Sequence, residues 1–177
     1  MKKHIVIRLI LVSLILTFFI AATGSIVGKA EKVGPAAGLK APEFALSDLS
    51  GKKYLLKEIV AQNKVTLVNF WATWCPPCRR EIPEFIAFYK KYSKQKVALL
   101  GINLQENPPE VKNFVALNKM NFPVLTDTKG SVAGQYQVYA IPTTFFLDSK
   151  GKVRRKIEGA TDQKTLEGIV KKLLREK

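Results

Sequence analysis

The sequence contains only two cysteines, Cys75 and Cys78, and a single histidine, His4. A small exported domain held together by disulfides would have more cysteines, spread along the chain, so that class of protein is excluded. A structural zinc site needs four nitrogen or sulfur ligands, which these three residues cannot supply. We therefore predict no metal site and no bound cofactor. Redox chemistry is the main use left for the cysteine pair.

Acidic residues are also scarce. The chain has 14 Asp and Glu against 29 Lys and Arg, a formal net charge of +15, and no acidic residue precedes Glu31. A basic surface of this kind suits nucleic acid or an anionic membrane. The lysines are scattered, however, and no stripe of arginines alternating with aromatic residues is present. We therefore predict no nucleic-acid binding and favour a basic face beside anionic lipid.

The N-terminal segment, residues 1–27, has the pattern of a membrane anchor. Lys2, Lys3 and Arg8 precede an uncharged run, Leu9–Val27, whose helical length of about 28 Å is close to a hydrocarbon core of ~30 Å. The basic residues predict a cytoplasmic N-terminus and a single-pass cell-membrane protein whose remainder is extracytoplasmic. Small residues near the end of the run leave a cleaved signal peptide as the alternative. Both alternatives export the domain to a compartment where disulfides persist.

The rest of the chain divides into a tether, residues 28–41, rich in Gly, Ala and Lys, and a folded domain, residues 42–177. Strands are expected at 42–46, 53–55, 65–71, 97–104, 122–125, 143–147 and 153–157, and helices at 57–62, 76–92, 109–118 and 132–138. A last helix is expected to start at Thr161, its N-cap. Alternating strands and helices predict an α/β fold, with a central sheet flanked by helices on both faces.

A continuous apolar strand leads directly into Cys75-Pro76-Pro77-Cys78 and the helix that follows. The first cysteine is thus placed at a helix N-terminus, where unpaired N–H groups and the helix dipole favour a thiolate. Both prolines lack N–H groups but preset φ for a helix start. We expect an exposed Cys75 to attack a substrate disulfide and a shielded Cys78 to resolve the mixed disulfide. The alternative, a structural cysteine pair, is disfavoured by this strand–helix junction.

The stretch FWATWCPPCRREIPEF resembles the active-site region of the thioredoxin superfamily, in particular its exported, membrane-tethered branch, the ResA/TlpA/CcmG-like thiol–disulfide oxidoreductases. The resemblance covers about residues 40–177 and implies a thioredoxin-like fold, a central mixed sheet with an N-terminal β-hairpin. Ala140–Thr144 (AIPTT) resembles the loop that holds a cis-proline, here Pro142, facing the dithiol. Pro83 matches a kink in the family's active-site helix. The distance in sequence from Cys78 to Pro142 leaves room for an extra strand–helix insert, typical of this branch.

The proton relay is where the sequence departs from plain thioredoxins, which carry a buried Asp in the strand before the motif. Asn69 occupies that position and cannot titrate. Glu81 matches an acid that ResA-like proteins place near the dithiol. A carboxylate in an apolar cleft has a raised pKa and can exchange protons with Cys78. The alternative is an exposed Glu81 paired with Arg80 or a lysine. We predict that Cys75, Cys78 and Glu81 are the catalytic residues.

The predicted substrate contacts surround the dithiol: they are Trp74, Pro76, Pro77, Ile141 and Pro142. Trp74 is expected to be a partly exposed wall of the cleft, because it lies beside the attacking cysteine at the end of the strand. The backbone beside the predicted cis-proline would face a bound peptide.

The resemblance implies a reductant of exported disulfides, with apocytochrome c as substrate during cytochrome c maturation. It also implies a membrane electron donor of the CcdA/DsbD type, while membrane lipid would contact the N-terminal helix. The motif does not settle the direction of electron flow, so a disulfide oxidase or isomerase stays open. A peroxidase is disfavoured because Ala72–Cys75 lacks the proline of the peroxiredoxin motif and has Thr73 at the wrong spacing. The non-enzymatic alternative is a binding module with an idle dithiol.

Overall fold

Strand β3 (Val65–Trp71) forms the centre of the fold, and all of its residues are buried. In the computed structural model, which describes residues 31–176, β4 (Val97–Leu104) pairs with β3 in parallel, whereas β6 (Thr143–Asp148) pairs with it in antiparallel orientation. The continuous apolar sequence of β3 follows from this position, because both faces of a central strand are covered. The predicted mixed central sheet is therefore confirmed.

The complete sheet has the order β5–β4–β3–β6–β7, with β5 (Val124–Asp127) and β7 (Val153–Glu158) at its edges. A separate antiparallel hairpin of β1 (Ala45–Ser47) and β2 (Lys53–Leu55) precedes it, as predicted. The predicted extra strand–helix unit is also present, because β4 and the helix after it lie between the active-site helix and β5.

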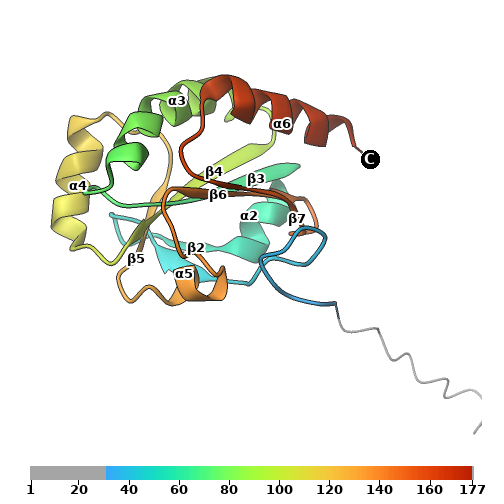
Figure 1. Cartoon of the computed structure of the whole chain (residues 1–177), viewed down its shortest axis with the longest axis horizontal. Helices are drawn as coiled ribbons and strands as arrows, with labels where there is room; N and C mark the ends of the chain where they lie inside the picture. Colours follow the sequence, from blue (N-terminus) through green and yellow to red (C-terminus); the bar gives the residue numbers. More distant parts are fainter. Residues whose placement is uncertain (1–30, 177) are drawn as a thin grey trace, which may run out of the picture. The chain divides into compact units, whose positions relative to one another are not determined.

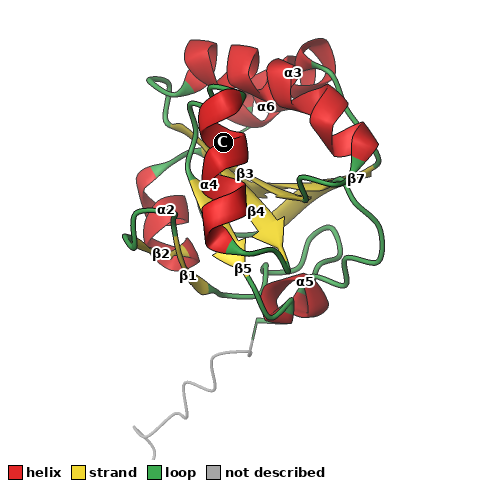
Figure 2. Ribbon diagram, turned by 90° about the vertical axis from the view of Figure 1, so that its left-hand side faces the viewer, coloured by secondary structure: helices red, strands yellow, loops and turns green. Residues whose placement is uncertain are grey.

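Helices cover both faces of the sheet (Figure 1; Figure 2). The helices α3 (Pro76–Tyr92), α4 (Pro108–Leu117) and α6 (Gln163–Arg175) contribute to the core on one face. The shorter helices α2 (Leu56–Gln62) and α5 (Ser131–Gln135) contribute to the core on the other. This confirms the predicted α/β fold.

Strand β3 supplies side chains to both cores by the alternation of an extended chain. Val65, Leu67 and Trp71 belong to the core under α3, α4 and α6. Val68 and Phe70 belong to the core on the opposite face. The active-site helix therefore starts from a strand fixed on both sides, which positions its first turn.

Several predicted boundaries differ from the structure; the strand expected at 42–46, for example, is observed at Ala45–Ser47. The strand expected at 122–125 begins at Val124, because Phe122 is buried by packing in the core rather than by sheet pairing. The helix expected at 132–138 ends at Gln135. The N-cap of α6 is Asp162, not Thr161, because the Asp162 carboxylate accepts the N–H of the third helical residue at 2.7 Å.

The predicted anchor, residues 1–27, lies outside the described residues. Between residues 31 and 176, no helix is both long and apolar enough to cross a membrane. The prediction of a tether is wrong at its end, because the backbone of residues 38–41 pairs with the hairpin between β6 and β7 and with the start of β7. Ala41 is buried and donates its N–H to Gly151, while Leu39 accepts the N–H of Val153. Irregular pairing of this kind leaves no periodic pattern in a sequence.

Candidate active site

The two cysteines lie at the first turn of α3. Cys75 is the N-cap and Cys78 is in the first helical turn, and they form a disulfide with a Cα–Cα distance of 5.3 Å. The backbone N–H of Cys78 points to the sulfur of Cys75 at 3.3 Å. Pro76 and Pro77 occupy the first two helical positions, as expected for residues whose fixed φ suits a helix start.

A loop from the distant part of the chain faces the disulfide. The Ile141–Pro142 peptide bond is cis, as the resemblance implies, and the carbonyl oxygen of Ile141 lies 3.7 Å from the sulfur of Cys75. Pro142 is buried and Ile141 is half-buried. The structure thus brings the predicted cis-proline loop to the predicted dithiol.

The exposure of the site differs from the prediction at Cys75. Its relative exposure is 2%, against 0% for Cys78, so the prediction of an exposed Cys75 is wrong for this disulfide form. The sulfur is covered because it bonds to Cys78 and lies against the loop before Pro142. The accessible groups are its neighbours: Trp74 is 67% exposed and Pro76 is exposed, while Pro77 is half-buried.

Glu81 is buried, with 2% relative exposure, on the same face of α3 as Cys78, one turn further on. One carboxylate oxygen accepts the side-chain amide of Asn69 at 2.9 Å, and the other accepts the backbone N–H of Thr161 at 3.1 Å. Burial raises the pKa of Glu81 to about 7, against the lowering effect of these two hydrogen bonds. The exposed ion pair considered above is therefore wrong, and the group titrates near neutral pH.

Asn69 is suited to its place beside a carboxylate. Its amide nitrogen donates to Glu81 and to the hydroxyl of Thr144, at 2.9 and 3.0 Å. An aspartate at this position would put a second negative charge at hydrogen-bond distance from Glu81, which raises the pKa of one of the two. The chain therefore has one titratable group here, held by a neutral donor.

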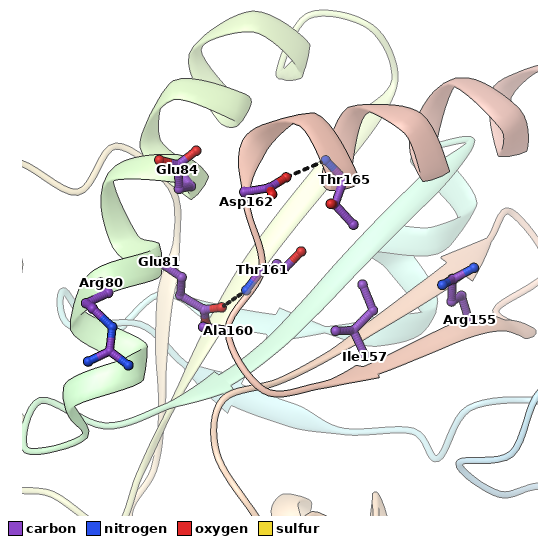
Figure 3. Close-up of a pocket in the computed structure, with 9 residues that line it drawn as sticks. All are labelled: Arg80, Glu81, Glu84, Arg155, Ile157, Ala160, Thr161, Asp162 and Thr165. Carbon is purple, nitrogen blue, oxygen red and sulfur yellow. Dashed lines mark hydrogen bonds between the residues drawn. The ribbon is translucent and has the colours of Figure 1, made fainter.

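Glu81 also borders an open cleft of about 520 Å³ between α3, β7 and the start of α6 (Figure 3). Arg80, Glu84 and Arg155 line the same cleft, and Figure 3 shows the bond from Thr161 to the Glu81 carboxylate. The cleft brings solvent to the edge of an otherwise buried acid. It offers a path by which a proton can pass between Glu81 and bulk water.

Sequence reasoning missed a second carboxylate, Glu106, in the loop after β4. Its oxygens accept the backbone N–H of Thr73 at 2.7 Å, the Thr73 hydroxyl, and the side-chain amide of Asn103 at 2.6 Å. It thereby fixes the turn that carries Trp74 and Cys75 toward the helix. The available signal was topological: parallel strands β3 and β4 end at the same edge of the sheet, so the residues after them meet.

A shallow hollow of about 190 Å³ lies next to the dithiol on the side of Trp74 and Ile141. Tyr139, which is 91% exposed, is among its other lining residues and was not predicted from the sequence. A hollow with two exposed aromatic side chains beside a disulfide is a suitable surface for a peptide. The further lining residues are Leu104, Gln105, Val138 and Ala140.

These features define the class of protein. A CxxC disulfide at the start of a helix, after the central strand of a mixed sheet and facing a cis-proline loop, is the arrangement of a thioredoxin-like thiol–disulfide oxidoreductase. Its structural relatives agree. StoA from Bacillus subtilis is 30% identical with a TM-score of 0.65, over 73% of this chain and 96% of that one. A thiol:disulfide interchange protein of the thioredoxin family from Chlorobium tepidum is 32% identical with a TM-score of 0.66, over 76% and 95%.

Comparison of sequences gives the family. Residues 37–156 match the AhpC/TSA family, and the chain belongs to it. The thiol-disulfide oxidoreductase ResA of Bacillus cereus is 36% identical over 98% of this chain and 99% of its own length. ResA of Geobacillus thermodenitrificans is 37% identical over 86% and 88%. The chain is a thiol–disulfide oxidoreductase that acts on disulfide-bearing substrates.

Proposed function

We propose that this oxidoreductase reduces disulfides of exported proteins, with apocytochrome c as the substrate during cytochrome c maturation. The proposal includes the roles of the site residues. Cys75 attacks, Cys78 resolves, Glu81 exchanges a proton, and the cleft wall with the cis-proline loop holds the substrate peptide. It is supported by ResA relatives that cover nearly the whole chain.

The reaction begins with the reduced dithiol. The Cys75 thiolate attacks one sulfur of the substrate disulfide, forms a mixed disulfide and releases one substrate thiolate. Cys78 loses its proton and attacks the sulfur of Cys75, which closes the Cys75–Cys78 disulfide and releases the second substrate thiolate. Two electrons pass to the substrate. Glu81, with a pKa of about 7, suits the proton step because it is neither fully protonated nor fully ionised near neutral pH.

The pair of prolines at the helix start supports reduction, and the reduction potential decides the direction of electron flow. Backbone N–H groups of the first turn stabilise a thiolate at the N-cap, and a stabilised reduced form makes a dithiol oxidising. Pro76 and Pro77 have no N–H, so the N–H of Cys78 is the donor left in the first turn for the sulfur of Cys75. A less stabilised thiolate corresponds to a lower potential, which suits a reductant.

The placement of the enzyme is part of the same proposal. Residues 1–27 act as a single-pass anchor, and the catalytic domain works on the extracytoplasmic side, where a reductant needs a supply of electrons. A membrane protein of the CcdA/DsbD type would return the Cys75–Cys78 disulfide to the dithiol. A domain that starts before residue 42 is supported by residues 38–41, whose backbone pairs with the hairpin between β6 and β7 and with the start of β7.

The decisive experiment is trapping in cells. In the Cys78→Ala variant the mixed disulfide on Cys75 cannot resolve, so the natural substrate stays attached and can be identified by mass spectrometry. We expect an exported protein with a CxxC pair, and we expect no adduct with Cys75→Ser. A reduction potential measured against glutathione gives the direction. A value well above that of glutathione would overturn the reductant role and support an oxidase.

A further inference from the structure

One end of the central sheet carries a group of lysines, referred to here as the basic end: Lys40, Lys64, Lys94, Lys96, Lys150 and Lys152. Lys64 and Lys96 directly precede the parallel strands β3 and β4, and the N–H of Lys64 donates to the carbonyl of Lys96 at 2.7 Å. The register of β3 with β6 pairs Val65 with Asp148, so the hairpin that contains Lys150 and Lys152 lies beside Lys64.

The remaining contacts make the group continuous. Lys64, Lys150 and Lys152 line one open cavity of about 570 Å³. Lys40 forms a backbone bridge with Lys152. Lys94 lines a hollow with Lys96. The lysines come from four separate parts of the sequence, so no run of positive charge in the sequence predicts this group.

The carboxylates near the basic end do not neutralise it. Lys152 pairs with Glu31 at 3.1 Å, and Arg154 pairs with Asp148 and Glu176 at 3.4 and 2.5 Å. The other five lysines have no ion-pair partner among residues 31–176. Four of these five are exposed and one is half-buried. The basic end therefore presents a net positive charge to solvent.

The basic end lies opposite the dithiol and next to the point where the described chain begins. Strand β3 runs from Lys64 to the residues before Cys75, a length of roughly 20 Å. Glu31 lies at the basic end through its contact with Lys152. Figure 1 shows the segment from residue 31 beside β7, whereas α3 begins at the opposite end of the sheet.

We propose that the basic end docks on anionic phospholipid headgroups and holds the dithiol away from the bilayer. Lysines near an anionic surface are attracted to it as point charges, without the fixed geometry that arginine gives to phosphate recognition. The basic end offers no exposed aromatic side chain on which a nucleic-acid base could stack, within residues 31–176. The inference rests on the extracytoplasmic membrane position proposed above.

The test uses the domain from residue 31 onward, which contains both hydrophobic cores. Solved relatives match about three quarters of this chain (73% and 76%) over nearly their whole length, 96% and 95%. Binding is measured by co-sedimentation with vesicles of phosphatidylcholine containing about one-third phosphatidylglycerol, at ~0.1 M salt. One variant changes Lys64, Lys96 and Lys150 to Gln. The matched control changes Lys112, Lys129 and Lys164 to Gln, which removes the same charge from exposed positions outside the basic end.

We expect the basic-end variant to lose on the order of 100-fold in vesicle partitioning, because each lysine near such a surface contributes about fivefold. The control variant should lose much less, and pure phosphatidylcholine vesicles should not bind. Equal losses in both variants would overturn the inference, as would tighter binding to a DNA oligonucleotide than to vesicles. Insulin reduction by both variants is measured in parallel. If the basic-end variant reduces insulin as well as wild type but no longer binds vesicles, membrane docking and enzymatic activity are shown to be separate properties.

Discussion

The buried Glu81 gives the most specific prediction, a pH-dependent stability that Glu81→Gln removes. Its pKa is raised from 4.5 to about 7 in the folded protein, so folding favours the protonated form. The stabilisation is complete below about pH 4.5 and is lost as the pH rises through about 7. A rise of the pKa from 4.5 to about 7 corresponds to about 3 kcal/mol. Between pH 4 and pH 8, the free energy of unfolding of the wild-type protein should therefore fall by about 3 kcal/mol relative to that of Glu81→Gln.

The assay is urea unfolding of both oxidised proteins across that range, followed by circular dichroism. Only the difference between the two proteins is interpreted, because other groups titrate in both. Glu84→Gln removes a carboxylate from the next turn of α3 and controls for the loss of one charge. A difference between wild type and Glu81→Gln that stays constant from pH 4 to pH 8 would show that Glu81 does not titrate near neutral pH. The proton-exchange role would then have no basis.

Three substitutions test other parts of the structure through urea unfolding. Glu106→Ala leaves three donors around the turn before the dithiol without their acceptor and should cost about 1–3 kcal/mol. Gly101→Ala should cost about 1–3 kcal/mol by overpacking, because its new Cβ would lie 3.0 Å from a ring carbon of Phe122. Tyr136→Phe removes the hydroxyl that donates to the carbonyl of Pro42 at 2.8 Å in a buried site, and should cost about 1 kcal/mol.

Each of these has an outcome that would contradict it. Glu106→Gln keeps an oxygen acceptor, so it should recover most of the stability that Glu106→Ala loses. Equal losses in the two variants would exclude the positioning role of Glu106. A Gly101→Ala protein as stable as wild type would mean that Phe122 moves aside freely. An unchanged Tyr136→Phe protein would mean that the buried bond contributes nothing net.

The sequence carries most of the fold because its main signals are local. Apolar continuity predicts β3 as observed, and the spacing of apolar residues predicts α3 over Pro76–Tyr92 as observed. The position of the cysteine pair at their junction needs no tertiary information. The cis bond before Pro142 was implied by resemblance and is present.

The parts that could not be predicted depend on contacts between distant residues. The N–H of Thr161 donates to the Glu81 carboxylate, 80 residues earlier in the chain. Thr161, the predicted N-cap, therefore has a distant partner. Asp162 takes the capping position instead. The burial of Cys75 depends on the carbonyl of Ile141, which no local pattern places. Propensity and periodicity describe neighbours along the chain, and these contacts are not neighbours.

The capping of α3 by the sulfur of Cys75 links two quantities that are usually measured apart. The atom that gains and loses electrons is also the atom that accepts the N–H of the first helical turn. The thiolate and the disulfide sulfur can differ in how well they cap the helix. This difference in free energy is part of the redox equilibrium, and each 1.4 kcal/mol of it changes the reduction potential by about 30 mV. The reduction potential of this protein therefore includes the strength of a helix cap. The potential can be tuned by the residues of that turn without altering either cysteine.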